Sequence, residues 1–336
     1  MRYTINQRQT FAILVLASLL GALWLTSAHL GRVWVVLYAA LFPAIFRAII
    51  VASAHVEPTN PWMVMRVWLA MRRGEIVLHY QPKVTLATGE TTRVEALARW
   101  NHPRLGQLLP AQWLHATESR LLEMRFSRYI LDAAIRQASL WRRDMRDLLV
   151  EINVSPRSFA DQRLVGRVAD LLERWDLPPS FIALEITEAA LEMPERALTV
   201  ADQLTAIGVS LALDDFGIGH SSFDRLVRLP FAEIKIDKRF VIAMLGSDRH
   251  RAVVNAVINL GHGLGMDVVA EGVETAATRD RLLASGCDKG QGFLFSPALP
   301  PGELTRWIDS QRLRRLDPAE RPRDEHSAAD SAACAC

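Results

Sequence analysis

The sequence predicts an α/β protein: a modified TIM-like (β/α)8 barrel with an antiparallel first strand, preceded by two transmembrane helices. The barrel is predicted because eight short apolar stretches alternate with helical periodicity over roughly 240 residues, about the length such a barrel needs. The transmembrane helices are predicted because the first sixty residues contain two long apolar stretches that carry almost no charge.

The N-terminal apolar stretches cover residues 11–30 and 33–54, and each is long enough to span a bilayer. The first carries no Asp, Glu, Lys or Arg, and the second contains Pro43 and Arg47. Proline is tolerated in such helices, and an arginine near an interface can extend its charge to water. Residues 1–54 are therefore interpreted as a transmembrane hairpin. A cleaved signal peptide is the alternative for the first stretch, and the second stretch argues against it.

The arginines around the hairpin predict its orientation. They flank it at Arg2, Arg8, Arg66, Arg72 and Arg73, with only Arg32 in the short turn. Positive charges favour the cytoplasmic side, so both ends of the hairpin are expected there. Residues 55–61 form a linker in which two prolines discourage helix continuation.

The candidate strands lie at 75–81, 93–100, 148–154, 181–187, 209–215, 233–237, 266–272 and 292–296. Helical segments between them include 126–142, 190–207 and 251–264. About a dozen residues separate the first two strands, too few for a crossover helix, so these strands are expected to be antiparallel. A doubly wound open sheet is the alternative, disfavoured because no glycine-rich phosphate-binding sequence follows the first strand.

Almost every predicted strand carries an acid, amide or lysine in or near its end: Gln81, Glu95, Asn153, Glu185, Asp214, Asp215, Lys235, Glu271 and Gln291. The carboxyl ends of barrel strands meet at one mouth, so these groups are expected to converge. Clustered carboxylates favour Mg²⁺ or Mn²⁺, and the adjacent aspartates suit a pair of ions. No histidine stands at these strand ends, which argues against a zinc peptidase.

The charge balance and the cysteines exclude other classes of protein. The chain has 336 residues and a formal net charge of +2, so no DNA- or RNA-polymer-binding surface is predicted. Three cysteines do not make a disulfide framework, which favours a reducing compartment. Cys334 and Cys336 end a polar tail, 317–336, predicted to be disordered; a metal or lipid site there is the alternative to spare thiols.

The motifs, taken in order, resemble those of the EAL domain family of cyclic di-GMP-specific phosphodiesterases. The signature triplet stands in "VEALARW", and "EINVS", "ALEITE", "ALDDFGIGHSS", "EIKIDKRFV", "VVAEGVET" and "GCDKGQGF" follow in the family's order. The resemblance covers about residues 65–308, and the domain is assigned to 62–316. It implies hydrolysis of cyclic di-GMP to linear pGpG by a cyclic-guanylate-specific phosphodiesterase with two Mg²⁺ or Mn²⁺ ions. Because cyclic di-GMP is a cytoplasmic signal in bacteria, the resemblance and the predicted hairpin together lead us to expect a bacterial inner-membrane protein with a cytoplasmic catalytic domain.

The resemblance further implies roles for single residues. Metal ligands are expected at Glu95, Asn153, Glu185, Asp214, Asp215 and Glu271. Lys235 is expected to contact the attacking water, Glu188 to anchor the loop after the aspartate pair, and Glu274 to support the site as a further catalytic carboxylate. Gln81, Arg99 and Gln291 are expected to contact substrate. Each residue alone also has a structural explanation, such as helix capping or a solvated charge.

Three positions depart from the family's pattern: Leu121, Ile218 and His220. The last two lie in the loop after Asp215, through which a homodimer is expected by resemblance. An alternative function is therefore a weakly active or inactive EAL domain that binds cyclic di-GMP as a receptor, or contacts a partner protein as a scaffold. Because none of the expected metal ligands is missing, the enzyme is the favoured interpretation.

Overall fold

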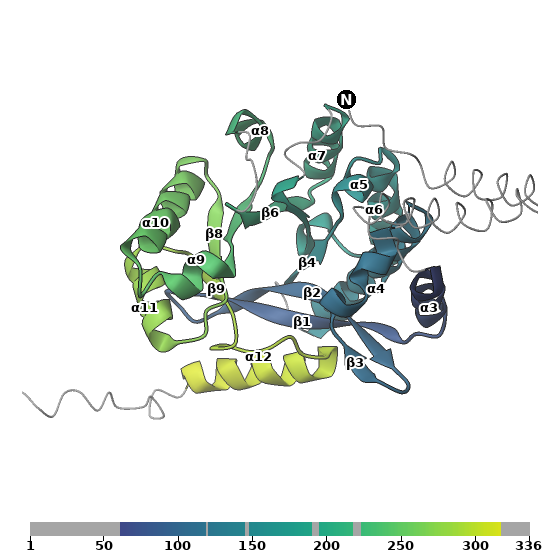
Figure 1. Ribbon diagram of the computed structural model, residues 1–336, viewed down its shortest axis with the longest axis horizontal. Coiled ribbons are helices and arrows are strands. Elements are labelled where there is room, and N and C mark those ends of the chain that lie inside the picture. The colour runs from purple at the N-terminus through teal and green to yellow at the C-terminus, as the bar shows by residue number, and fades with distance from the viewer. Residues whose placement is uncertain (1–60, 119, 145–147, 190–194, 218–222, 317–336) are drawn as a thin grey trace, which may run out of the picture. The chain divides into compact units, whose positions relative to one another are not determined.

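The computed structural model describes residues 61–118, 120–144, 148–189, 195–217 and 223–316 (Figure 1). The predicted transmembrane hairpin, the linker before residue 61 and the tail 317–336 lie outside these ranges. No helix within them is long and apolar enough to cross a bilayer.

Eight strands close into a barrel. They follow the order β1-β9-β8-β7-β6-β5-β4-β2, and β1 also pairs with β2, while β3 extends β2 on the outside. The bounds are β1 Ile76–Thr85, β2 Thr91–His102, β3 Gly106–Leu108, β4 Leu149–Asn153, β5 Ile182–Thr187, β6 Ser210–Phe216, β7 Glu233–Ile236, β8 Asp267–Glu271 and β9 Lys289–Gln291. Strand β1 is antiparallel to both neighbours and the other barrel pairs are parallel, which confirms the predicted antiparallel first strand.

The helices cover the outside of this sheet (Figure 1). They are α3 Pro61–Arg72, α4 Arg120–Asp144, α5 Pro156–Phe159, α6 Arg163–Arg174, α7 Arg196–Ala206, α8 Phe223–Arg228, α9 Lys238–Ala243, α10 Asp248–Gly263, α11 Ala276–Ala284 and α12 Pro301–Leu316, with 3-10 helices η1 Pro110–Gln112, η2 Leu114–Glu118 and η3 Pro179–Phe181. On α4, Ile130, Ala134, Ala138 and Trp141 are buried at helical spacing, as the sequence predicts.

Side-chain caps fix where several helices begin. Ser247 accepts a hydrogen bond from the amide of His250, and Thr275 accepts one from the amide of Thr278. Each hydroxyl satisfies an amide that the helix itself leaves without a partner. Helix α10 therefore begins three residues before the predicted segment 251–264.

The predicted last strand at 292–296 is wrong. The eighth barrel strand is β9, and the chain turns directly after Gln291. The amide of Val273 donates to the Gln291 carbonyl and the amide of Leu294 donates to the Val273 carbonyl, so residues 292–296 wrap around Val273. A Cβ on Gly292 would lie 2.2 Å from that carbonyl oxygen, so only glycine permits the approach. Phe293 is 71% exposed as a result.

The strand period of two separates the apolar and polar sides of the barrel wall. On β4, Val150 and Ile152 belong to the main hydrophobic core, while Glu151 reaches Lys83 of β1. Strands β1 and β4 are not neighbours in the sheet, so their side chains can meet only through the barrel interior. The interior is therefore polar and the core lies between the sheet and the helices.

Candidate active site at the barrel mouth

Lys235 of β7 lies at the centre of a buried acidic cluster. Its Nζ forms an ion pair with Glu185 of β5, and lies 2.7 Å from Glu271 Oε1 of β8 and 3.0 Å from Asp214 Oδ1 of β6. Glu95 Oε2 of β2 lies 3.4 Å away. Lys235 is 1% exposed. The predicted convergence of polar strand ends therefore occurs, around a lysine that contacts four carboxylates.

The adjacent carboxylates of Asp214 and Asp215 reach the same site because β6 is irregular there. Consecutive side chains of a regular strand point to opposite faces. Here the register with β7 shifts between Leu213 and Phe216, and Asp215 has φ +56, a left-handed conformation that a non-glycine residue rarely adopts. The amide of Asp215 donates to Asp214 Oδ1 at 2.8 Å.

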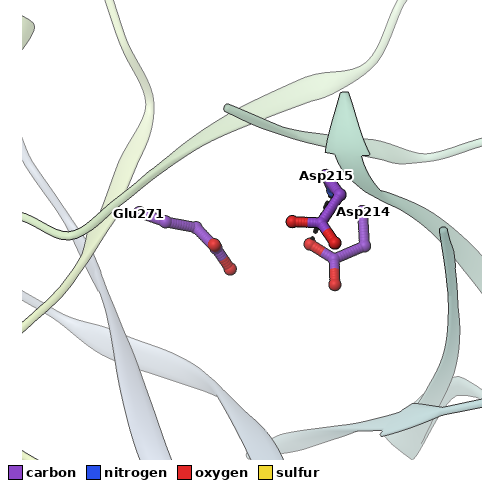
Figure 2. A group of neighbouring side chains, drawn as sticks. All are labelled: Asp214, Asp215 and Glu271. Atoms are coloured by element: carbon purple, nitrogen blue, oxygen red, sulfur yellow. Dashed lines mark hydrogen bonds between the residues drawn. The ribbon is translucent and has the colours of Figure 1, made fainter. Parts of the chain in front are cut away.

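Glu271 faces this aspartate pair from β8 (Figure 2). One carboxylate oxygen of each residue, Asp214, Asp215 and Glu271, can be chosen so that all three lie within 4.8 Å of one another. Such a group, half-buried and beside further acids, has the donor chemistry that a divalent cation needs.

Amides complete the mouth on the side of β1 and β2. Asn153 Nδ2 and Gln291 Nε2 each donate to Glu95 at 2.7 Å, one to either carboxylate oxygen. Gln291 also donates to Gln81 Oε1 at 3.2 Å, and Gln81 donates to the Ser296 carbonyl. Glu95 is therefore held in one orientation by two strands besides its own.

Glu188 lies just after β5 and is buried. Its Oε2 accepts a hydrogen bond from the amide of Gly217 at 3.1 Å. Gly217 has φ +100, and a Cβ there would lie 3.2 Å from the ring of Phe240. The contact fits the expectation that Glu188 anchors the loop after the aspartate pair. That loop, with Ile218, His220 and the expected dimer contact, lies outside the described residues.

Two other predicted residues lie at the edge of the cluster or beyond it. Arg99 stands four residues after Glu95 on β2, hence on the same face, and is half-buried. Glu274 is exposed between β8 and α11, and within the described ranges it forms no hydrogen bond or ion pair with the cluster. The structure therefore does not bring Glu274 together with the other candidates. The backbone of Leu121 belongs to the first turn of α4.

The charges of the cluster do not balance. Burial and the neighbouring Glu95 raise the pKa of Glu185 well above its ordinary value, and burial raises that of Glu271 to about 7. Burial opposes ionisation of Glu95 too, but Lys235 and its other partners hold its pKa at about 2. The same acids keep the pKa of Lys235 raised despite its burial. One lysine cannot neutralise this many carboxylates, so some of them hold protons.

The residues present fit divalent cations. Both carboxylate oxygens of Glu185 are buried without a hydrogen-bond partner, although Oε1 lies close to Lys235. An unpartnered buried carboxylate oxygen costs free energy unless a cation or donor contacts it. Together with Asp214, Asp215 and Glu271, Glu185 supplies the hard oxygen donors that Mg²⁺ and Mn²⁺ prefer.

A second charged cluster lies deeper in the barrel, and the sequence analysis missed it. This floor cluster consists of Lys83, Arg93, Glu151, Glu233, Asp267 and Lys289. Lys83 Nζ pairs with Glu151, lies 2.7 Å from Glu233 Oε1 and lies 3.7 Å from Glu185 Oε1. Glu185 therefore connects the floor cluster to the mouth.

A periodic signal could have revealed the floor cluster. The pairs Arg93/Glu95, Glu151/Asn153, Glu233/Lys235 and Lys289/Gln291 each place the floor residue two positions before the mouth residue. On the antiparallel β1 the order is reversed, with Gln81 before Lys83. Because side chains two apart share a face of a strand, each pair lines the interior at two heights.

Comparisons with known proteins agree with this geometry. The family model described as "EAL domain" matches residues 66–298. The bifunctional diguanylate cyclase/cyclic di-GMP phosphodiesterase MucR of Pseudomonas aeruginosa is 40% identical over 237 residues, which cover 70% of this chain and 35% of MucR. The cyclic di-GMP phosphodiesterase RocR of the same species is 37% identical over 228 residues, 68% of this chain and 58% of RocR. The chain thus spans only part of these relatives.

A solved structure, the PaMucR phosphodiesterase in complex with c-di-GMP, is also similar. Its TM-score is 0.70 at 39% identity, and the match covers 72% of this chain and 99% of that one. Because the family model matches more than half of the chain and the structure reproduces the barrel, the chain belongs to the EAL domain family.

Proposed function

We propose that this chain hydrolyses cyclic di-GMP to linear pGpG. The observation that carries the proposal is the acidic cluster around Lys235, which contains carboxylates from four strands and leaves both Glu185 oxygens without a hydrogen-bond partner. Relatives named as cyclic di-GMP phosphodiesterases at 37–40% identity support the substrate and reaction.

The cluster would hold two divalent ions, Mg²⁺ or Mn²⁺, through Glu95, Asn153, Glu185, Asp214, Asp215 and Glu271. When bound, such ions supply a water of lowered pKa and offset the negative charge that grows on phosphoryl oxygens. The amide of Asn153 now donates to Glu95, and its rotation would present the carbonyl oxygen instead.

The protein's own groups position the reactants. Lys235 would donate hydrogen bonds from its buried ammonium and so stabilise negative charge beside the attacked phosphorus. Gln81, Arg99 and Gln291 line the β1–β2 side, where they would contact the nucleotide. In the reaction, the water oxygen forms a bond to phosphorus and one P–O3′ bond breaks. The water gives up a proton and the leaving 3′-oxygen takes one up, which leaves pGpG.

We propose further that residues 11–54 anchor the chain in the bacterial inner membrane with the barrel in the cytoplasm. The support is the length and lack of charge of the two apolar stretches and the flanking arginines. A reporter fused after Gln311 is expected to be active in the cytoplasm; activity restricted to the periplasm would contradict this orientation.

The reaction is tested by incubating the purified full chain with cyclic di-GMP, with Mg²⁺, with Mn²⁺ and with a chelator. We expect pGpG with either ion and none with the chelator. Glu95→Ala should abolish product, while Thr92→Ala, exposed on the same strand, serves as the matched control. Nucleotide binding without product in all conditions would favour the receptor alternative. Absence of both would favour a scaffold.

A further inference from the structure

An exposed surface beside the barrel mouth combines apolar and basic side chains, and at its edge Glu75 pairs with Arg73 at 3.8 Å. It is formed by residues 61–74, which contain α3, and residues 101–117, which contain β3, η1 and most of η2. We call it the apolar–basic face. Neither segment contains Asp or Glu. Its exposed apolar side chains are Trp62 (78% exposed), Met65 (51%), Leu105 (64%), Leu109 (53%) and Leu114 (39%). Its exposed arginines are Arg66, Arg72, Arg73 and Arg104.

The two segments form one continuous surface. Helix α3 packs against η2, and α3 lies on the same side of the barrel as β3 (Figure 1). The guanidinium of Arg66 lies 5.8 Å from the ring centroid of Trp100 and contacts His102 at 2.5 Å. The amides of Arg104 and Leu105 donate to His102 Nδ1, which fixes the turn that carries Leu105. The segments that carry the exposed leucines and tryptophan are therefore held together rather than scattered over the molecule.

Helix α8 also exposes apolar side chains, Phe223 and Val227, but acidic Asp224 lies on the same helix. This helix follows the loop through which a dimer is expected. The apolar–basic face is distinguished by exposed tryptophan, leucine and arginine with no carboxylate in either segment, the composition that favours the interface of an anionic bilayer.

The chain that precedes this face is short enough to keep the face near a bilayer. This step rests on the proposed membrane anchor. The second predicted span ends at residue 54 and α3 begins at Pro61. Seven residues extend over at most about 25 Å. Helix α3 therefore begins within that distance of the point where the chain would leave the membrane.

The face also lies at the end of the barrel that carries the candidate site. Gln81 of β1 is opposite Glu95 of β2 in the site, and Ile76 is opposite Trp100 further toward the mouth. Helix α3 precedes Ile76, and β3 follows β2 beyond Trp100. We propose that the apolar–basic face docks on the surface of an anionic lipid bilayer, which holds the β1–β2 side of the mouth next to the membrane.

The test places an environment-sensitive fluorophore on Leu105→Cys in the full chain, with Cys334→Ser and Cys336→Ser. Cys287 can stay because it is buried and burial raises its pKa to about 12. The matched control label is Leu283→Cys on α11, a leucine that is 42% exposed elsewhere. Both proteins are reconstituted in two kinds of vesicle, one of phosphatidylglycerol and phosphatidylcholine and one of phosphatidylcholine alone. Both kinds carry a lipid-borne nitroxide quencher.

We expect the label at position 105, and not that at 283, to be quenched in the anionic vesicles. Arg104→Glu should remove the quenching, since each basic residue near an anionic surface favours binding about fivefold. Equal quenching in both lipid mixtures, or at both labels, overturns the proposal. So does a label at 105 that is shielded from aqueous iodide in detergent as well, because another protein segment then covers the face.

Carbonate extraction of the same vesicles distinguishes docking of the apolar–basic face from membrane anchoring by residues 11–54. Protein that resists extraction but shows no quenching at 105 has the anchor without the docked face. Quenching at 105 in protein that carbonate removes shows a docked face without the anchor.

Discussion

The barrel interior contains two charged clusters that differ in balance. The floor cluster has three cations and three carboxylates, and ion pairs connect all six groups. The mouth cluster has one lysine, Lys235, among five carboxylates, with Arg99 at its edge. Both are largely buried, and Glu185 lies between them.

The difference separates structure from function. A buried charge is costly unless it is paired, and the floor cluster meets that requirement within the protein. The mouth cluster does not, so it retains an excess of negative charge that cations or protons must offset. An excess of negative charge is what a metal site needs before the metal binds. The mouth cluster is therefore expected to contribute less to the stability of the metal-free protein than the floor cluster does.

The largest expected effect is on turnover at the mouth. Asp214→Asn keeps the size of the side chain and removes one negative charge. We expect the rate of cyclic di-GMP hydrolysis to fall by roughly a thousandfold, since a metal supplies several kcal/mol of charge stabilisation. The same variant should be at least as stable as the wild type without metal. Lower stability by urea unfolding would show that the mouth is balanced after all.

The next effect is on stability at the floor. Lys83→Met removes the cation nearest to Glu151 and Glu233 and leaves them Arg93 at 3.6 Å as a shared partner; breaking a buried pair costs about 3–5 kcal/mol. Urea unfolding should report a loss of this size. The matched control is Lys238→Met, an exposed lysine at the start of α9. If the two variants are equally stable, the floor cluster does not support the barrel.

Metal binding should stabilise the fold only through the residues of the mouth cluster. Mn²⁺ at a hundred times its Kd is expected to raise the free energy of unfolding by about 2.7 kcal/mol per site. Lys83→Met should keep this increase, measured from its own lower baseline, and Asp214→Asn should lose most of it. Thermal unfolding with and without Mn²⁺ checks both. An equal loss in the two variants would mean that the clusters act as one unit.

The smallest effect is a pair of opposite pH dependences in metal-free protein. Burial raises the pKa of Glu271 to about 7 from 4.5, so its contribution to stability is complete below pH 4.5 and is lost as pH rises through about 7. Burial also opposes ionisation of Glu233, but Lys83 and Arg93 outweigh it and hold its pKa at about 2. Its contribution is present above pH 4.5 and is lost as pH falls through about 2.

Two variants separate these dependences. Glu271→Gln should flatten the stability profile between pH 4.5 and 7, and Glu233→Gln should flatten it between pH 4.5 and 2. Urea unfolding in chelator-treated buffer across this range checks both. If Glu271→Gln changed the profile below pH 4.5 and Glu233→Gln changed it above pH 4.5, the assignment of the two carboxylates would be wrong.

Most of the fold could be predicted from sequence because the barrel repeats one local pattern. Seven of the eight predicted strands lie within a few residues of the observed ones, since β-branched runs bounded by turns are local signals. The eighth was misplaced because "GFLFS" is as apolar as a strand. What turns it aside is the backbone of Val273, which is distant in sequence and reaches Gly292 only in the folded chain.

The site shows the same division. The acids and amides of the mouth could be identified because they end apolar runs, and Glu95, Asp214 and Lys235 do meet. Glu274 was expected at the site on resemblance alone and lies exposed. That both adjacent aspartates reach one side could not be predicted, because it depends on the irregular register of β6 and the left-handed backbone of Asp215.

The sequence by itself determined which residues alternate, roughly where most strands and helices lie, and which strand ends carry oxygen donors, because each property depends on near neighbours in the chain. Only the tertiary structure decided which charged side chains meet inside the barrel and how many of each sign meet there. When β1 and β2 close the sheet, the six charges of the floor cluster balance one another, and the mouth cluster keeps an excess of negative charge. Electrostatic energy depends on distance through space, and that distance exists only after the barrel has closed.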